Sequence, residues 1–565
     1  MKKLSFFIIL CTLIPLASFG QGYDIILTNG RVFDGSGNPW FYADVAISDD
    51  KIVAIGDLSS ASADEIIDIT GLYISPGFID IHSHALDPAS EGRGLDSEDR
   101  RRRIAPNLIS QGITTVIVNQ DGRSSTEPIR DQIGTLEANG IGVNAGLMVG
   151  HNSIRFKVLG EDNERYSTVG EIQELKSIVR EAIIGGAFGL SAGLEYEPGR
   201  WSNTEEVIAL VEEIEPFGGV YISHQRSEAK TPMRWLPSDE SPTPPTLLDA
   251  VEETIRIGEE TGATVVASHL KSRGANYWGG SRAAISLIEQ ARNRGVSVYA
   301  DQYPYNTSGS DGNTRLLPNW VFDFDRFGIE STQPWNYKLP LEEALKDPQL
   351  TTALYADISH SLAYRGGPER IVVFEFPDSS YIGKNISELA MENGISPQDM
   401  VIELQRRGFE NRRGGARLRS FSMHEDDLNA IAATQWTATT TDGSITLPED
   451  GNNIHARFYG TFPRKIFKYA LTNNTISVAH AIRSSTSLPA QIMNIQNRGL
   501  IREEYYADIV VFDLDEIQDQ STFFEPHQHS SGIEYVFVNG VSALSQGKLQ
   551  STLSGRVLTP ANSRN

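Results

Sequence analysis

The fold of this chain can be predicted starting from residues Tyr73-Ile-Ser-Pro-Gly-Phe-Ile-Asp-Ile-His-Ser-His84. The Ile, Phe and Tyr residues around Pro76-Gly77 predict a buried strand that ends at two histidines, His82 and His84. Side chains at positions i and i+2 of a strand share one face, so both imidazoles should point the same way. Two converging imidazoles suit a cation such as zinc. A histidine pair alone more often marks a polar junction between strand and loop.

The rest of the chain repeats this pattern of apolar, β-rich runs, each followed by a helical pattern. Such alternation is typical of βα units around a parallel sheet, and eight units predict a (β/α)8 TIM-like barrel. Its active site should lie at the C-terminal ends of the strands. The predicted strands are residues 74–84, 114–121, 142–151, 187–194, 219–224, 264–269, 296–305 and 436–442.

The two ends of the chain carry short strands separated by turn residues. Neither set is long enough to close a domain alone, so we predict that both termini form one small β-sandwich domain from residues 22–73 and 491–565. The strands expected there are residues 23–34, 44–48, 51–56, 65–70, 507–513 and 535–540.

Residues 310–423 fall between the seventh and eighth predicted strands and break the alternation. They contain irregular sequence with Pro and Trp, a predicted helix at 341–345 and a predicted strand at 370–376. A structureless loop of that length is uncommon, so we interpret the segment as an insertion after barrel strand 7, placed to act as a lid. Its arginine-rich part, 406–419, is interpreted as a solvated face. The barrel is then expected in residues 74–309 and 424–490.

The composition and the N-terminal residues limit which classes of function this protein can have. A formal net charge of -24 over 565 residues argues against nucleic acid or an anionic membrane as partner. Residues 1–20 have two lysines, an apolar run and small residues, and predict a signal peptide. We therefore expect an exported protein, periplasmic or secreted, with no membrane attachment after cleavage. Because Cys11 is the only cysteine and lies inside that peptide, a metal site must use histidines and carboxylates.

Four further residues end predicted strands: Asp121, His224, His269 and Asp442. A single histidine at a strand end is more often a hydrogen-bonded structural residue. Together with the first histidine pair, however, these side chains would meet at one face of a barrel, which packing alone does not require. We therefore predict a site for one or two metal ions, with a carboxylate bridging the ions and a second carboxylate as base.

Several motifs carry a family resemblance: residues 77–84, 150–155, 191–198, 301–305, 455–464 and 487–490. With the strand-end histidines, they resemble the N-acyl-D-amino-acid deacylases (D-aminoacylases) of the amidohydrolase superfamily. The resemblance implies Zn²⁺ ligands at His82, His84, Asp121, His224 and His269, with Asp442 as ligand and catalytic base. That family typically has Cys at the bridging position. Asp121 is a harder ligand than thiolate, and we expect it to shift the metal preference.

The expected reaction is metal-assisted hydrolysis of an amide. Zinc lowers the pKa of a bound water from about 15.7 to about 7, and Asp442 would take a proton from this nucleophile and deliver it to the leaving amine. The resemblance implies small N-acyl-D-amino acids as substrates; the preference for D-isomers rests on it alone. Substrate contacts are expected from Lys271 and Arg457 to the carboxylate, from Tyr303 or His151 to the carbonyl, and from Tyr196 and Ser308 along the pocket. Ordinary packing or ion pairing is the alternative for each.

Three other functions fit the same pattern. A cyclic-amide hydrolase of the dihydroorotase or hydantoinase kind would share the barrel, although those relatives use a carboxylated lysine and no lysine ends the third or fourth predicted strand. A D-dipeptidase would share the chemistry. A non-enzymatic, exported scaffold on an inactive barrel would have no need for metal-binding residues at so many strand ends.

Overall fold

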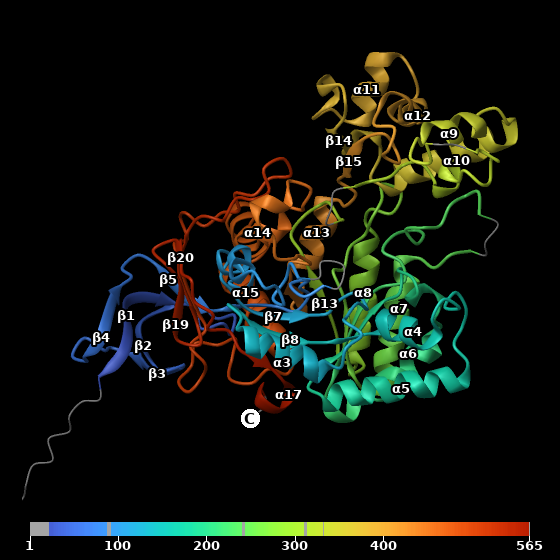
Figure 1. The fold of residues 1–565 in the computed structure, drawn as a ribbon. Helices are drawn as coiled ribbons and strands as arrows, with labels where there is room; N and C mark the ends of the chain where they lie inside the picture. Colours follow the sequence, from blue (N-terminus) through green and yellow to red (C-terminus); the bar gives the residue numbers. More distant parts are fainter. Residues whose placement is uncertain (1–21, 88–91, 240–242, 310–312, 331–332, 564–565) are drawn as a thin grey trace, which may run out of the picture.

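A computed structural model describes residues 22–87, 92–239, 243–309, 313–330 and 333–563. The predicted signal peptide, with Cys11, lies outside these residues. Within the described ranges, none of the helices combines the length and the apolar character needed to span a bilayer. Figure 1 shows strands from both chain ends at the left, the barrel in the centre and right, and a helical segment at the top.

Both ends of the chain build one β-sheet, which confirms the predicted small β domain. Its strand β17 pairs antiparallel with both β5 and β18, so C-terminal strands lie directly against N-terminal ones. Leu27, Ile74 and Val511 are buried in the core of this domain. The strands are β1 (Tyr23–Val32), β2 (Phe41–Ser48), β3 (Lys51–Gly56), β4 (Ala63–Asp68), β5 (Tyr73–Pro76), β17 (Ile509–Phe512), β18 (Ile533–Val538), β19 (Val541–Ser545) and β20 (Lys548–Leu549).

Parallel strands form the barrel. Backbone hydrogen bonds between the segments that follow its last and first strands close it. The Asp442 N–H donates to the His82 carbonyl at 3.0 Å, and the His84 N–H donates to the Gly443 carbonyl at 2.8 Å. This arrangement confirms the predicted (β/α)8 barrel. Its strands are β6 (Phe78–Asp80), β7 (Ile113–Val118), β8 (Asn144–Leu147), β9 (Val149–Gly150), β10 (Gly189–Gly193), β11 (Val220–His224), β12 (Thr264–Ala267), β13 (Val298–Gln302) and β16 (Thr437–Thr439).

The first predicted strand, residues 74–84, is wrong as a single element. Its first part, β5, belongs to the terminal sheet, and its second part, β6, belongs to the barrel. The change of sheet occurs at Gly77, where a Cβ atom would lie 2.2 Å from Thr114 Oγ1. Only glycine lacks that atom, so only glycine fits next to Thr114 at the point where the chain passes from one sheet to the other. His82 and His84 then follow β6 as loop residues.

The third barrel strand is also divided. Strand β8 pairs with β7, whereas β9 pairs with β10. The C-terminal strand β21 (Val557–Leu558) pairs in parallel with β8, with Val557 opposite Ala145. The end of the chain therefore joins the barrel sheet, although the sequence predicts that residues 491–565 belong to the terminal β domain.

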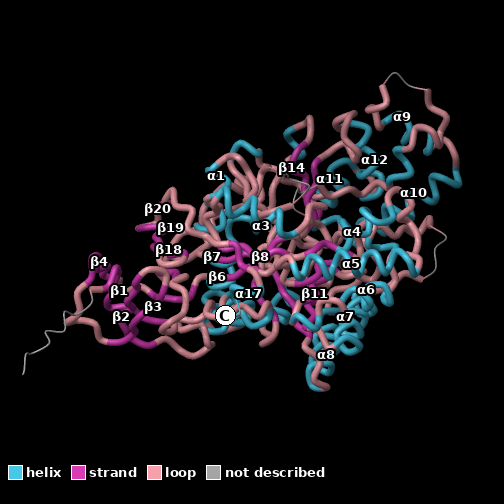
Figure 2. The backbone as a smooth tube through the Cα atoms, turned by 60° about the horizontal axis from the view of Figure 1, so that its bottom comes forward, coloured by secondary structure: helices cyan, strands magenta, loops and turns pink. Residues whose placement is uncertain are grey.

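Helices surround the barrel strands (Figure 2). Helix α7 illustrates why they form: Thr246 and Asp249 make a reciprocal capping box at its start, Val251 and Ile255 are buried, and Gly262 ends it with φ 76°. The helices outside the insertion are α1 (Arg100–Arg103), α2 (Pro106–Ile109), α3 (Ile129–Asn139), α4 (His151–Leu159), α5 (Val169–Ile184), α6 (Thr204–Val211), α7 (Leu247–Thr261), α8 (Gly280–Asn293), α13 (Glu425–Ala432), α14 (Arg457–Arg464), α15 (Val478–Ser485), α16 (Ser487–Ile492) and α17 (Pro560–Ser563).

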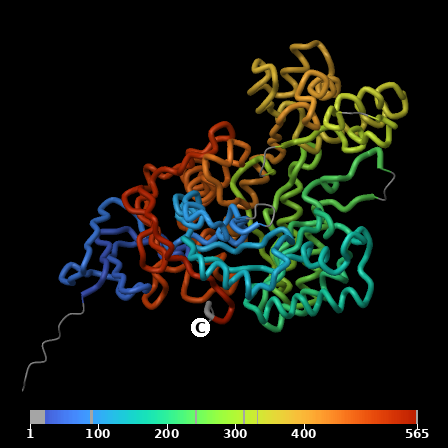
Figure 3. The backbone as a smooth tube through the Cα atoms, viewed as in Figure 1, coloured from blue at the N-terminus to red at the C-terminus, as the bar shows by residue number. Residues whose placement is uncertain are grey.

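The insertion lies between β13 and β16, as expected, and has a hydrophobic core of its own. Figure 3 shows it as a yellow and gold body above the barrel. Leu341, Ile358 and Val401 are buried within that core. One of its helices and one strand are predicted from the sequence. Its elements are α9 (Lys338–Ala344), α10 (Pro348–Tyr364), β14 (Ile371–Glu375), α11 (Ile386–Asn393), α12 (Pro397–Arg407) and β15 (Arg417–Ser420).

A buried polar network joins the terminal sheet to the barrel. Asp508 Oδ1 accepts the Asn539 N–H at 2.8 Å, and Asp508 Oδ2 accepts from Asn144 Nδ2 at 3.2 Å. The Arg498 guanidinium pairs with Asp508 and donates to Asn539 Oδ1 at 2.7 Å. These four residues are at most 4% exposed. Because β8 supplies Asn144, the network fixes the barrel against the terminal domain.

We expect Asp508→Ala to destabilise the protein by about 3–5 kcal/mol, because it leaves the buried Arg498 guanidinium without its carboxylate. Urea unfolding followed by circular dichroism measures the change. Glu260→Ala is the matched control, since it removes the exposed Arg256–Glu260 pair and should change stability by less than about 1 kcal/mol. Equal effects of the two substitutions would contradict the structural role of the network.

Candidate active site

A cavity of about 860 Å³ lies at the C-terminal ends of the barrel strands. Barrel residues such as Asp121, His224 and His269 line it, and the insertion contributes Arg315 and Arg365. Barrels of this kind build their active sites from the loops at this end. The predicted site and the insertion therefore share one open space.

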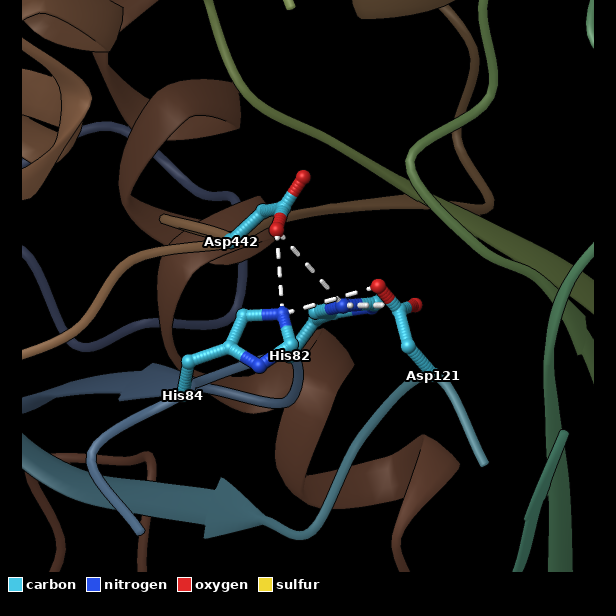
Figure 4. Close-up of side chains that lie close together, drawn as sticks. All are labelled: His82, His84, Asp121 and Asp442. Atoms are coloured by element: carbon cyan, nitrogen blue, oxygen red, sulfur yellow. Dashed lines mark ion pairs between the residues drawn. The ribbon is translucent and has the colours of Figure 1, made fainter. Parts of the chain in front are cut away.

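The first histidine pair faces two carboxylates (Figure 4). His82 Nε2 lies 3.3 Å from Asp121 Oδ1 and 3.9 Å from Asp442 Oδ1. His84 Nε2 lies 3.6 Å from Asp121 Oδ2 and 3.2 Å from Asp442 Oδ1. Both imidazoles thus point to the same place, although they lie beyond the strand that was expected to align them.

Asp121 also faces the second pair of histidines. Its Oδ1 lies 3.8 Å from His224 Nδ1 and 3.5 Å from His269 Nε2, and these two nitrogens are 2.9 Å apart. Asp121 belongs to two groups of candidate ligands, and within each group the ligand atoms lie within 4.8 Å of one another. The structure therefore brings the six predicted ligands together, with Asp121 in the bridging place.

The donor atoms fit a metal ion. Imidazole nitrogens and carboxylate oxygens are ligands for zinc and similar cations. His82 Nε2 and Asp121 Oδ1 are buried and have no hydrogen-bond partner among the described residues. Buried polar atoms are nearly always satisfied, and a cation between these two would satisfy both.

Three of the candidate ligands have a strained backbone. Asp121, His269 and Asp442 have φ values of 57°, 34° and 48°. Non-glycine residues rarely adopt this left-handed region, at a cost of about 1–3 kcal/mol each. Hydrogen bonds hold two of them there: His269 N–H donates to Asp301 Oδ1 at 2.7 Å, and Asp442 N–H donates to the His82 carbonyl at 3.0 Å.

The charges of the site stabilise the ionised carboxylates. Burial opposes ionisation of Asp121, but the interaction with His82 and the hydrogen bonds from the neighbouring histidines together outweigh burial and lower the pKa of Asp121 well below its ordinary value. Burial also opposes ionisation of Asp442, but Arg457, with Nη2 at 2.9 Å, and the neighbouring histidines together outweigh it and lower the pKa of Asp442. For His84, hydrogen bonds to Asp121 and Asp442 overcome the effect of burial and raise its pKa. Both carboxylates are therefore in the form that ligands and bases require.

The two residues predicted to bind a substrate carboxylate already have partners. Lys271 and Arg457 line the cavity. The Lys271 ammonium contacts the Glu228 carboxylate, and Arg457 pairs with Asp442. The Tyr303 ring lies 5.3 Å from Lys271 Nζ and 4.6 Å from Arg457 Cζ. A substrate carboxylate must therefore compete with protein carboxylates for these cations.

Of the other predicted substrate residues, Tyr196 and Ser308 line the cavity, whereas His151 is not among its lining residues. His151 is fully buried at the start of α4, and its Nε2 lies 2.9 Å from Glu206 Oε1. Glu206 also pairs with Arg155 at 2.6 Å. The expectation that His151 polarises a substrate carbonyl is therefore wrong, because its ring belongs to a buried ionic cluster.

A second layer of carboxylates, not predicted from the sequence, lies behind the histidines. Glu195 Oε2 lies 3.2 Å from His224 Nε2, and Glu228 Oε1 lies 3.0 Å from His269 Nδ1. Each acidic residue follows a predicted strand end, Glu195 directly and Glu228 within four residues. That position is the signal that could have identified them, because loops after barrel strands build the site.

Comparison with known proteins identifies the family of this chain. Residues 379–543 match a model described as amidohydrolase family. A D-aminoacylase from Alcaligenes xylosoxydans xylosoxydans is 31% identical over 563 residues, covering 96% of this chain and 98% of that protein. The chain belongs to the D-aminoacylase family. As a member, it is a metal-dependent amidohydrolase, which confirms the predicted enzyme class and the family resemblance.

Two solved structures from the same family match nearly the whole chain. A D-aminoacylase studied for its binuclear metal center is 30% identical, with a TM-score of 0.71, and the match covers 95% of this chain and 100% of that one. An N-acyl-D-glutamate deacylase from Bordetella bronchiseptica, complexed with zinc and a phosphonate inhibitor, is 26% identical, with a TM-score of 0.70 and the same coverage. These family members are therefore similar in both fold and chain length.

Asp121→Ala should reduce the metal content of the purified protein, because it removes the one carboxylate shared by both ligand groups. Metal per protein is measured by inductively coupled plasma mass spectrometry after dialysis. Asp239→Ala, in a cavity-lining residue outside both groups, is the matched control and should retain the wild-type content. Unchanged metal in Asp121→Ala would remove it as a bridging ligand.

Proposed function

We propose that this protein is a zinc-dependent hydrolase that cleaves the amide bond of N-acyl-D-amino acids into a carboxylate and a free D-amino acid. The observation that carries the proposal is the convergence of two histidine pairs and two carboxylates beside one cavity. The relatives support the substrate class, since they include a D-aminoacylase and an N-acyl-D-glutamate deacylase.

Asp442 is the proposed general base. When bound, zinc acts as a Lewis acid toward a carbonyl and toward water. Asp442 then takes the proton of the attacking water and delivers it to the leaving nitrogen. Its place supports this role, because its Oδ1 lies 3.2 Å from His84 Nε2 while the residue also lines the cavity where an amide must lie.

Cationic residues on the cavity wall support an anionic substrate. Beyond Lys271 and Arg457, the insertion supplies Arg315 and Arg365. Arg315 donates to Asn319 Oδ1 at 3.4 Å, and Arg365 lies over the Tyr364 ring. Among the described residues, the cavity wall carries eight Lys and Arg side chains against six Asp and Glu side chains, in a protein whose formal net charge is -24. We propose that the cationic side chains attract the carboxylate of an acylated amino acid.

The insertion is proposed to act as a lid over this cavity. Its helix α10 contacts the loops that follow two barrel strands: Tyr364 OH accepts from Arg273 Nη1 at 2.8 Å, and Asp357 Oδ1 accepts the Ser238 N–H at 3.0 Å. These polar contacts at the edge of the cavity support a cover, because they join the insertion to the loops that build the site. Export to the periplasm or medium is proposed from the composition of residues 1–20 alone.

A substrate panel tests the proposed function. Protein loaded with a measured amount of zinc is assayed with an N-acetyl-D-amino acid, its L-isomer, a D-dipeptide and a hydantoin. We expect hydrolysis of the first and little of the others. Turnover of the hydantoin or the D-dipeptide alone would overturn the proposal in favour of a cyclic-amide hydrolase or a dipeptidase. Removal of zinc with a chelator should abolish turnover, and its return should restore it.

Asp442→Asn should retain the fold and lower kcat by about 10²–10⁴-fold, the usual contribution of a general base. The measurement is kcat on the best substrate of the panel, with circular dichroism and metal content as checks. Glu449→Gln is a suitable control, because Glu449 lies near Asp442 in the sequence, is exposed and pairs with Arg101. Near-normal turnover by Asp442→Asn would remove Asp442 as the base.

A further inference from the structure

We propose that Glu195 is a positioning residue that determines which ring nitrogen of His224 faces the metal site. Glu195 follows β10 and is 3% exposed, so its carboxylate must have partners. Its Oε2 lies 3.2 Å from His224 Nε2, and its Oε1 accepts the Met233 N–H at 2.6 Å. The inference rests on the metal site and does not depend on which amide the enzyme cleaves.

The two nitrogens of His224 have different surroundings. Among the described residues, Nε2 contacts the Glu195 carboxylate at 3.2 Å, whereas Nδ1 faces Asp121 Oδ1 at 3.8 Å and His269 Nε2 at 2.9 Å. A Glu228 oxygen lies farther away, within 4.8 Å of a His224 ring nitrogen. An ionised carboxylate accepts hydrogen bonds and donates none. Glu195 therefore keeps the proton on Nε2, and Nδ1 retains the lone pair that a metal ion needs.

The Glu195 carboxylate also fixes the orientation of the His224 ring. The Tyr196 ring packs on the His224 ring, with centroids 4.1 Å apart. The Met233 N–H holds the other carboxylate oxygen, and Met233 belongs to the loop after β11 that lines the cavity. Glu195 thus connects one metal-binding histidine to the backbone of the cavity wall. Partners of this kind orient metal-binding histidines, and their loss commonly lowers metal affinity by about 10–100-fold.

Glu195→Gln separates this role from simple packing, because glutamine has the same shape. If the amide oxygen accepts from Met233, its NH2 group faces His224 Nε2, and the ring must move its proton to Nδ1. If the amide turns over, its NH2 group faces the Met233 N–H, and because two buried donors then oppose each other, the first orientation is favoured. Neither orientation keeps both native hydrogen bonds, in which residue 195 accepts from His224 and from Met233.

The experiment measures zinc affinity of the metal-free, full-length protein by competition with a chromophoric chelator. We expect Glu195→Gln to bind zinc about 10–100-fold more weakly than wild type, and Glu195→Asp, which keeps a carboxylate acceptor, to recover part of the loss. Glu206→Gln is the matched control. It removes a buried glutamate from a histidine that lies outside the cavity, so it should lower stability to urea without lowering zinc affinity.

A second readout is independent of affinity. Two-bond ¹H–¹⁵N correlation spectra of histidine-labelled protein, with His224 assigned by a His224→Asn variant, should show the proton on Nε2 in wild type and on Nδ1 in Glu195→Gln. Zinc affinity of Glu195→Gln within twofold of wild type, or an unchanged tautomer, would overturn the inference. Wild-type protein that binds no zinc would overturn the proposed metal site as well, whereas zinc binding without hydrolysis of the panel would overturn only the proposed function.

Discussion

The buried negative charge of Asp121 and Asp442 is the constraint on which the site depends. A carboxylate that is removed from water must be paired, or it becomes neutral. Here four imidazoles from three strand ends and the Arg457 guanidinium surround the two carboxylates. The barrel brings these groups together because its closure joins the His82 segment to the Asp442 segment through backbone hydrogen bonds. The chemistry of the site is therefore a consequence of how the barrel closes.

The ligands with a strained backbone are held in place by neighbouring polar groups. Left-handed backbone at three ligands would be costly in isolation, yet each lies between a barrel strand and a loop that is held by buried polar groups. The Asp80 carboxylate is one such support: it accepts from the Thr440 hydroxyl at 2.5 Å and from the His82 N–H at 3.1 Å. Burial raises the pKa of Asp80 to about 6, against these hydrogen bonds. The residues that position the ligands thus include at least one layer of side chains behind them.

The sequence contained enough to predict the barrel, the shared terminal domain and the six candidate ligands, because periodicity and strand-end residues are local signals. It did not reveal the change of sheet at Gly77, which depends on the neighbouring Thr114. Nor did it place His151, since a histidine after a strand looks the same whether it faces a cavity or a buried glutamate. Glu195 was missed for a related reason: its role depends on a partner 29 residues away.

Strand β21 has a consequence for how the molecule is made. It adds the last part of the chain to the third barrel strand, and β17 inserts C-terminal residues into the middle of the terminal sheet. Neither unit has all its strands until almost every residue has left the ribosome. An emerging chain would therefore remain incompletely folded throughout synthesis, with unpaired strand edges that need protection by chaperones.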